Sequence, residues 1–195
     1  MKTVFDLLQA AGIGAAVGIR PFLPALLVGA LAAGNLGVDF EGTSFAFLEK
    51  PPFLLAMLIG LVIVDIVRRR VSDERLDVGT GLIVLGVISL VVAALQGAGT
   101  LADHGKSVAA GIVVGVLAAL LALFAIPPLF ARVRTRLGAE AGLLPLYREA
   151  LGFVAAGLSV LFPPLAIFVI GGLAWLLAGG RRRQGEKYAG LRILR

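Results

Sequence analysis

The sequence predicts an all-α integral membrane protein with about six transmembrane helices, and three observations support this class. Hydrophobic residues make up 59% of the 195 residues and charged residues only 15%, whereas charged residues are about 25% of a typical soluble domain. The mean hydropathy is +0.99. Apolar segments that approach the ~20 residues needed to cross a bilayer recur along the whole chain.

The first apolar segment extends from Leu7 to Ala33 and is interrupted by the sequence Arg20-Pro21-Phe22-Leu23-Pro24. Asp6 precedes this segment and hydrophobicity resumes at Phe22, so we interpret it as transmembrane rather than as a secretory signal. Further apolar segments follow at 53–67, 79–96, 108–130, 144–162 and 165–179.

Charge predicts the orientation of these segments. Of the 18 cations, 15 fall on what would be one side of the membrane, Lys50 and Lys106 fall on the other, and Arg20 lies within a segment. The positive-inside rule therefore predicts six crossings in the inner (plasma) membrane, with the N- and C-termini cytoplasmic. We expect one polytopic domain over 1–180, in which 144–179 is a hairpin that turns at Pro163-Pro164.

Arg20 stands at the break of the first segment. A charge at the bilayer centre costs about 2.5–3.5 kcal/mol, so it usually faces a partner or water. Pro21 and Pro24 withdraw backbone donors, and broken backbone at membrane depth needs cover from protein or a cavity. Arg20 therefore either faces an anion beside the helix start at Phe22, or is structural and pairs with a carboxylate or with carbonyls that the prolines leave free.

Few carboxylates can serve as partners. Glu149 becomes a counter-charge to Arg20, or a proton carrier, if the helix at 144–162 begins below Leu144; otherwise it is interfacial. Asp65 is predicted to pair with Arg68 or Arg69 at helical spacing.

Catalytic and metal-binding groups are scarce. The chain has no cysteine, and it shows neither a phosphate-binding glycine loop nor a nucleophile elbow. His104, the only histidine, is predicted to be solvated in a short loop with Asp103, and zinc needs three or four protein ligands. Asp6 is expected to be a first-turn acidic residue with no further role. We therefore expect no metal, no cofactor and no enzymatic activity.

Small residues recur every fourth position, which lets helix backbones approach closely. These stripes are expected to pack helices within the chain, and homodimerisation is their alternative use. Their glycines are Gly14, Gly18, Gly111 and Gly115.

A weak internal repeat appears at a constant offset of 140 residues. Gln9, Ala10, Gly12, Ala15, Ala16 and Pro24 match Glu149, Ala150, Gly152, Ala155, Ala156 and Pro164. A true repeat would give two units of the same shape, so 5–34 would be a re-entrant hairpin with its tip near Arg20 and the N-terminus outside. The positive-inside bias favours a single broken span instead, and that is our preferred interpretation.

The tail over 181–195 is a basic juxtamembrane segment. Its cations should attract anionic lipid head groups by about 1 kcal/mol each near the surface. Binding to nucleic acid is not expected, because the topology already requires these charges. The cations expected to contact lipid are Arg181, Arg182, Arg183 and Lys187.

Three motifs resemble one uncharacterised family of bacterial membrane proteins. They are the break Gly18-Ile19-Arg20-Pro21-Phe22-Leu23-Pro24, the segment Leu144-Pro145-Leu146-Tyr147-Arg148-Glu149, and the tail Glu186-Lys187-Tyr188-Ala189-Gly190-Leu191-Arg192. The chain thus resembles the family known as domain of unknown function 4126. In that family the break more often has Asn-Ala-Tyr/Phe in place of Arg20-Pro21-Phe22, so the break itself is the shared device. The resemblance implies an integral membrane fold and no particular activity.

The expected function is passage of an unidentified small solute or ion across the membrane, with an anion as one option. The alternative is a non-transporting scaffold, assembly factor or lipid-organising protein that uses the stripes and the basic tail. The pathway would be lined by Arg20, Pro21, Phe22, Pro24, Glu149, Pro163 and Pro164.

Overall fold

The computed structural model of the chain describes residues 2–70, 79–137 and 142–191, without the side chains of 180–191. Within these ranges the chain forms seven α-helices and two 3-10 helices and no strand, which confirms the predicted all-α class. The elements are α1 (Lys2–Ile19), α2 (Phe22–Ala33), η1 (Ala46–Glu49), α3 (Pro51–Arg70), α5 (Thr80–Asp103), α6 (Val108–Leu137), α7 (Leu144–Leu161), η3 (Pro163–Leu165) and α8 (Ala166–Leu191).

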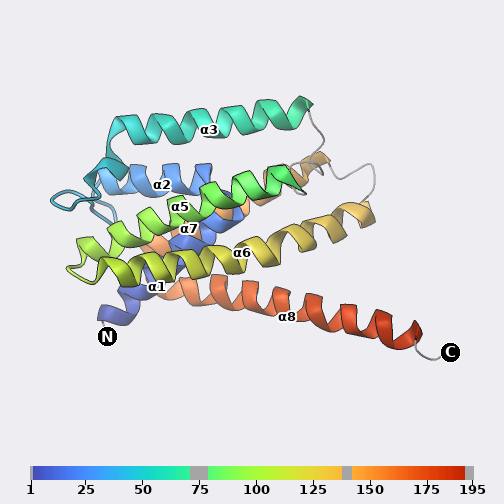
Figure 1. Ribbon diagram of the computed structural model, residues 1–195. Helices are drawn as coiled ribbons and strands as arrows, with labels where there is room; N and C mark the ends of the chain where they lie inside the picture. The colour runs from blue at the N-terminus through green and yellow to red at the C-terminus, as the bar shows by residue number, and fades with distance from the viewer. Residues whose placement is uncertain (1, 71–78, 138–141, 192–195) are drawn as a thin grey trace.

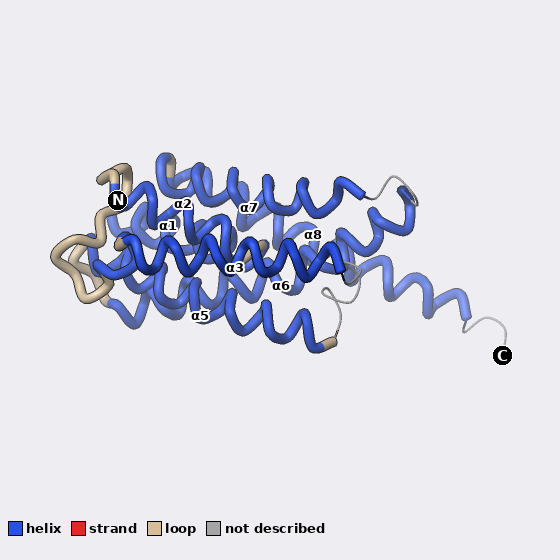
Figure 2. The backbone as a smooth tube through the Cα atoms, turned by 90° about the horizontal axis from the view of Figure 1, so that it is seen from above, coloured by secondary structure: helices blue, strands red, loops and turns tan. Residues whose placement is uncertain are grey.

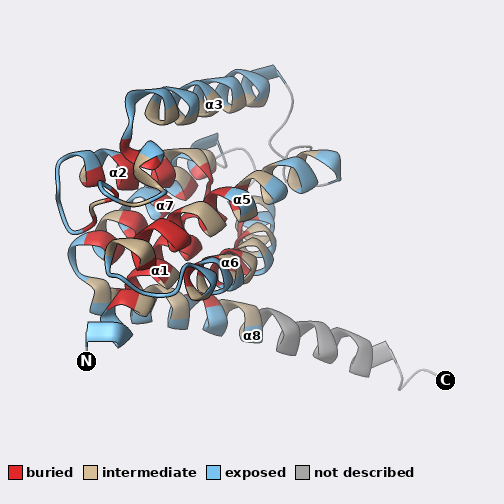
Figure 3. Ribbon diagram, turned by 60° about the vertical axis from the view of Figure 1, so that its left-hand side comes forward, coloured by how far each residue is buried: buried red, intermediate tan, exposed pale blue. Residues whose placement is uncertain are grey.

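Five described helices, α1, α3, α5, α6 and α7, are long and apolar enough to cross a membrane, and α2 and 163–179 are shorter apolar helices. Helix α3 lies at the periphery and has no buried residue (Figure 3). Large aliphatic side chains are exposed along it, a distribution that is rare in soluble monomers and is compatible with a membrane protein. They include Leu55, Leu58, Ile59, Val62, Ile63 and Ile66.

Helix α1 forms the centre of the bundle and packs against α5, α6, α7 and α8. Small residues allow this close approach. A Cβ on Gly14 would overlap the backbone of Gly115 in α6, and one on Gly18 would overlap the backbone of Ala119. Gly111 of α6 meets Gly97 of α5 in the same way. The predicted stripes thus pack helices of this chain against one another.

The segment 5–34 is a hairpin, so the single broken span preferred from the sequence is wrong. The carbonyl of Gly37, just beyond α2, accepts a hydrogen bond of 2.8 Å from Gln9 near the start of α1. The chain has therefore returned to the end of the bundle where it began (Figure 1). The positive-inside criterion had only Lys2 to weigh here, whereas the hairpin buries the small-residue face of α1.

The second hairpin joins α7 to α8 through the 3-10 turn at Pro163-Pro164, as the charge pattern predicted. Helix α8 then runs alongside α6 (Figure 2). The two hairpins enter the bundle from opposite ends, and α3, α5 and α6 run along its length between those ends.

We call the end that holds Arg68–Arg70 the arginine end, and the end that holds the segment 34–50 and His104 the loop end. Helix α1 begins at the loop end and α8 runs out past the arginine end (Figure 1). The structure therefore does not support six crossings with both termini on one side. Within the described residues, α3, α5 and α6 run the full length of the bundle, and α1 with α2 and α7 with α8 form the two hairpins.

Candidate functional site

The break between α1 and α2 is closed by an arginine other than the one predicted. Helix α1 ends at Ile19, whose carbonyl accepts a hydrogen bond of 3.2 Å from Nε of Arg148 in α7. Such side-chain donors satisfy carbonyls that a helix leaves free in its last turn. The guanidinium of Arg148 also lies 5.9 Å from the ring centroid of Phe130 in α6, a cation–π distance. Arg148 thus joins the tip to two neighbouring helices.

Arg20 is buried at the same tip and pairs with Glu149 of α7. Nε of Arg20 lies 3.3 Å from Oε1 of Glu149, and the Arg20 and Glu149 side chains are 6% and 15% exposed. Nη2 of Arg68, from α3, lies 3.3 Å from the same oxygen. We call Arg20, Arg68, Arg148 and Glu149 the Glu149 cluster. It connects the first hairpin to α3 and α7.

Glu149 reaches Arg20 although α7 begins at Leu144. The sequence predicted this contact only for a helix that begins below Leu144; that condition was wrong, because the tip of the hairpin comes to Glu149 instead. The second carboxylate oxygen, Oε2, is buried, and no hydrogen-bond partner for it lies within the described part of the chain. A proton, a water or a donor on a solute would satisfy this oxygen.

A cavity of about 380 Å³ that is open to the surface lies beside the cluster at the arginine end. A second pocket, of only about 10 Å³, adjoins Arg20, Arg148 and Ser89, which is space for about one water. Arg68 and Glu149 of the cluster thus line the larger pocket, and Arg20 and Arg148 line the smaller one. The cavity is lined by Asp65, Arg68, Arg69, Gly142, Pro145, Leu146 and Glu149. The predicted pair of Asp65 with Arg69 is confirmed at 2.9 Å.

The remaining pathway candidates divide between the two tips. Phe22 packs against Gly60 of α3, and Pro24 packs against Gly152 of α7, so both are near the Arg20 tip. Pro163 and Pro164 form the tip of the other hairpin. The structure thus brings Arg20, Pro21 and Glu149 together but places Pro163 and Pro164 at a second location.

Gln9 holds that second tip, and the sequence analysis assigned it no role. Its side chain is 2% exposed, and its Nε2 donates to the carbonyls of Gly37 at 2.8 Å and Val160 at 3.0 Å. In a continuous helix the Val160 carbonyl would accept from residue 164, but Pro164 has no backbone N–H. The side-chain amide of Gln9 supplies the missing donor.

His104 lies in the turn after α5 and is exposed, which agrees with the prediction of a solvated loop residue. Its Nδ1 lies 2.8 Å from the carbonyl of Thr100, and its Nε2 lies 3.5 Å from Asp6, which is itself buried. Asp103 accepts a hydrogen bond from the backbone of Asp39. These contacts tie the start of α1 to the loop end. Among the described residues no group of His, Asp or Glu side chains could hold a metal ion.

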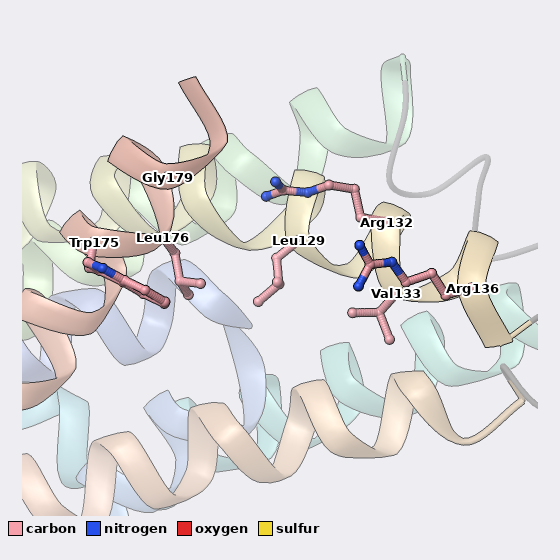
Figure 4. A pocket seen from close by; sticks show the side chains of 7 residues that line it. All are labelled: Leu129, Arg132, Val133, Arg136, Trp175, Leu176 and Gly179. Carbon is pink, nitrogen blue, oxygen red and sulfur yellow. The ribbon is translucent and has the colours of Figure 1, made fainter. Parts of the chain in front are cut away.

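A further pocket of about 220 Å³ lies between α6 and α8 at the arginine end. Figure 4 shows Arg132 and Arg136 on its α6 side and Trp175 on its α8 side. Leu129, Val133 and Leu176 complete an apolar wall. The tail residues predicted to contact lipid, Arg181, Arg182, Arg183 and Lys187, lie outside the described side chains.

Comparison with known proteins gives no match: no family model, no curated protein and no solved structure matches this chain.

Proposed function

We propose that this chain is a multi-pass protein of the inner membrane that lets a small solute or ion, anions included, cross the bilayer. The observation that carries the proposal is the Glu149 cluster, which lies at the tip of a broken helix pair and beside a cavity. Broken helices that meet near the middle of the membrane are the usual building blocks of solute sites in transporters.

The chemistry of the cluster suits exchange of one anion for another. Guanidinium groups form strong, directional hydrogen bonds with carboxylates and phosphates. In the structure Arg20 and Arg68 share one oxygen of Glu149. An anion that enters the cavity would compete with the Glu149 carboxylate for these two side chains. Protonation of Glu149 would have the same effect, because a neutral carboxyl pairs less strongly with a guanidinium.

The orientation follows from the described charges. Arg68, Arg69, Arg70, Arg132, Arg134 and Arg136 cluster toward the arginine end, so the positive-inside rule places this end in the cytoplasm. Three full-length helices then put the N-terminus on the outer side. This replaces our expectation of six crossings with two cytoplasmic termini.

Flux measurements test the proposal. Purified protein in liposomes should release at least one member of a panel of inorganic anions, small carboxylates, cations and neutral metabolites faster than protein-free liposomes do. Glu149→Gln should change that rate, whereas Glu41→Gln, at an exposed position in the 34–50 segment at the loop end, should not. The absence of flux for the whole panel would exclude the proposal.

Water access provides an independent test, because the chain has no native cysteine. Leu146→Cys places a thiol in the cavity and Ile63→Cys places one on the apolar face of α3; the two side chains are 66% and 54% exposed. A charged, membrane-impermeant thiol reagent should label position 146 and spare position 63. Equal labelling of both positions would mean that α3 does not face lipid.

A second candidate function is lipid organisation, and the pocket between α6 and α8 favours it. The pocket combines two arginines with apolar side chains and an exposed tryptophan, which suits the phosphate and acyl chain of an anionic lipid. Protein purified in mild detergent should retain such lipid in native mass spectra. The variant Arg132→Gln/Arg136→Gln should lose it, and Arg69→Gln should keep it. Equal retention by all three proteins would exclude this pocket.

A further inference from the structure

The contacts at the two tips involve residues that correspond to each other in the internal repeat, in which equivalent positions are 140 residues apart. Glu149 corresponds to Gln9, and Val160 corresponds to Arg20. Glu149 lies 3.3 Å from Arg20, and Gln9 donates to the Val160 carbonyl at 3.0 Å. Each of these contacts joins the residues that correspond to the two partners of the other. In each case a polar residue on the long arm of one hairpin holds the tip of the other.

The glycines of the repeat obey the same correspondence. Gly152 packs against Ile19, and its counterpart Gly12 packs against Ser159, the counterpart of Ile19. Phe22 and Pro24 also have identical counterparts in Phe162 and Pro164. Any two antiparallel helices in contact pair residues in this way, so the support for a repeat comes from two other features. Both tips carry Phe-x-Pro with glycines at equivalent positions, and each hairpin packs its second helix on the first helix of the other: α2 contacts α7, and α8 contacts α1.

The two hairpins run in opposite directions. Helix α1 begins at the loop end, where Gln9 meets Val160, and it ends at the arginine end, where Arg148 meets Ile19. Helix α7 begins at the arginine end and ends at the loop end. A two-fold axis between α1 and α7 therefore exchanges the hairpins, which is the arrangement of an inverted repeat.

We infer that the hairpins form an inverted repeat and that the contact of Gln9 with Val160 is a second barrier, which closes the pathway from the loop end. This inference rests on the proposed function. Gln9 and Arg20 are separated by about 16 Å along α1, roughly half of the ~30 Å hydrocarbon core of a bilayer. Both barriers therefore fit within the membrane, in series, with the buried residues Gly12, Ala16 and Ala156 between them.

Two conservative cysteine reporters test this arrangement. The Glu149 cluster is the first barrier and the contact of Gln9 with Val160 is the second. Ser89 adjoins the first barrier and Ser159 adjoins the second, and the two serines are 1% and 0% exposed. Ser89→Cys and Ser159→Cys should both be protected from a small impermeant thiol reagent in the otherwise unchanged chain. Lys106→Cys at the loop end and Arg69→Cys at the arginine end report which side the reagent reaches.

Weakening one barrier should expose only the reporter beside it. Gln9→Ala should raise the labelling rate of Ser159→Cys at least tenfold from the side that labels Lys106→Cys, and it should leave Ser89→Cys protected. Glu149→Gln should expose Ser89→Cys from the side that labels Arg69→Cys and leave Ser159→Cys protected. Gln9→Met, with a side chain of similar volume, replaces Gln9→Ala if the latter fails to fold.

The outcomes separate this inference from the proposed function. If both Gln9 variants leave Ser159→Cys protected, or expose both reporters equally, the second barrier is excluded even when the protein transports a solute. If the expected labelling pattern appears but no solute crosses the membrane, the two contacts seal the bundle at its ends as inferred. The protein then has no transport pathway, and the proposed function fails.

Discussion

The tip at Arg20 and the tip at Val160 occupy equivalent positions in the two hairpins but are held by different chemistry. At the arginine end a carboxylate is shared by two guanidinium groups. At the loop end a neutral amide donates to two backbone carbonyls. Loss of one partner leaves a buried charge in the first case and only buried dipoles in the second. The architecture is therefore symmetric while the energy needed to open each tip is not.

The largest effect should come from the charged tip. Glu149→Gln should lower the free energy of unfolding in detergent by about 3–5 kcal/mol, because it leaves Arg20 and Arg68 buried without their shared carboxylate. Arg20→Gln/Glu149→Gln should recover part of that loss, since it also removes one of the charges. If the loss in the double variant equals the sum of the losses in Arg20→Gln and Glu149→Gln, the two residues are not energetically coupled.

The neutral tip should be less costly to break. Gln9→Ala leaves the carbonyls of Gly37 and Val160 without their donor, for a loss of about 1–3 kcal/mol. Gln9→Glu should be at least as damaging, because a carboxylate cannot donate to a carbonyl. Chemical denaturation of the two variants beside Glu149→Gln measures the difference. A loss for Gln9→Ala that equals or exceeds that for Glu149→Gln would reverse the proposed order of the tips.

The repeat glycines should show a smaller asymmetry of the opposite sense, with the larger loss at the loop end. A Cβ on Gly12 would lie 2.6 Å from Cβ of Ser159 and 2.7 Å from Cβ of Ala166, whereas one on Gly152 would lie 3.1 Å from Cγ of Pro24. Overpacking costs about 1–3 kcal/mol, and the gain in helix propensity returns about 1 kcal/mol. Gly12→Ala should therefore lose about 1 kcal/mol and Gly152→Ala almost none. Gly171→Ala, with no atom within 4 Å, is the control for propensity alone in these unfolding measurements.

The smallest effect should come from the rim of the cavity. Asp65 and Arg69 form an i,i+4 pair whose side chains are 52% and 78% exposed. Such pairs contribute about 0.3–0.5 kcal/mol, so Asp65→Ala should shift the unfolding midpoint barely beyond error. A shift as large as that of Gln9→Ala would place Asp65 in the Glu149 cluster, contrary to its position in the structure.

The sequence predicted the parts of this site that depend on local pattern. The breaks at Arg20-Pro21 and Pro163-Pro164 follow from proline chemistry, and the pair of Asp65 with Arg69 follows from helical spacing. The roles of Arg148 and Gln9 depend on contacts with residues 129 and 151 positions away in the chain, and no local rule selects them. The choice between a span and a hairpin at 5–34 depends on how α1 packs, and the single cation at that end was a weak guide.

The three full-length helices have a consequence for how such a protein must be connected. Helices α3, α5 and α6 carry the chain from the loop end, where the first hairpin closes, to the arginine end, where the second begins (Figure 1). Because each of these helices carries the chain from one end of the bundle to the other, an odd number of them is needed for the second hairpin to begin at the end opposite to the first. The gain or loss of a single helix between the hairpins would turn both the same way. Gln9 would then no longer face Val160, nor Glu149 face Arg20. The two contacts between the hairpins therefore require that an odd number of helices connect them.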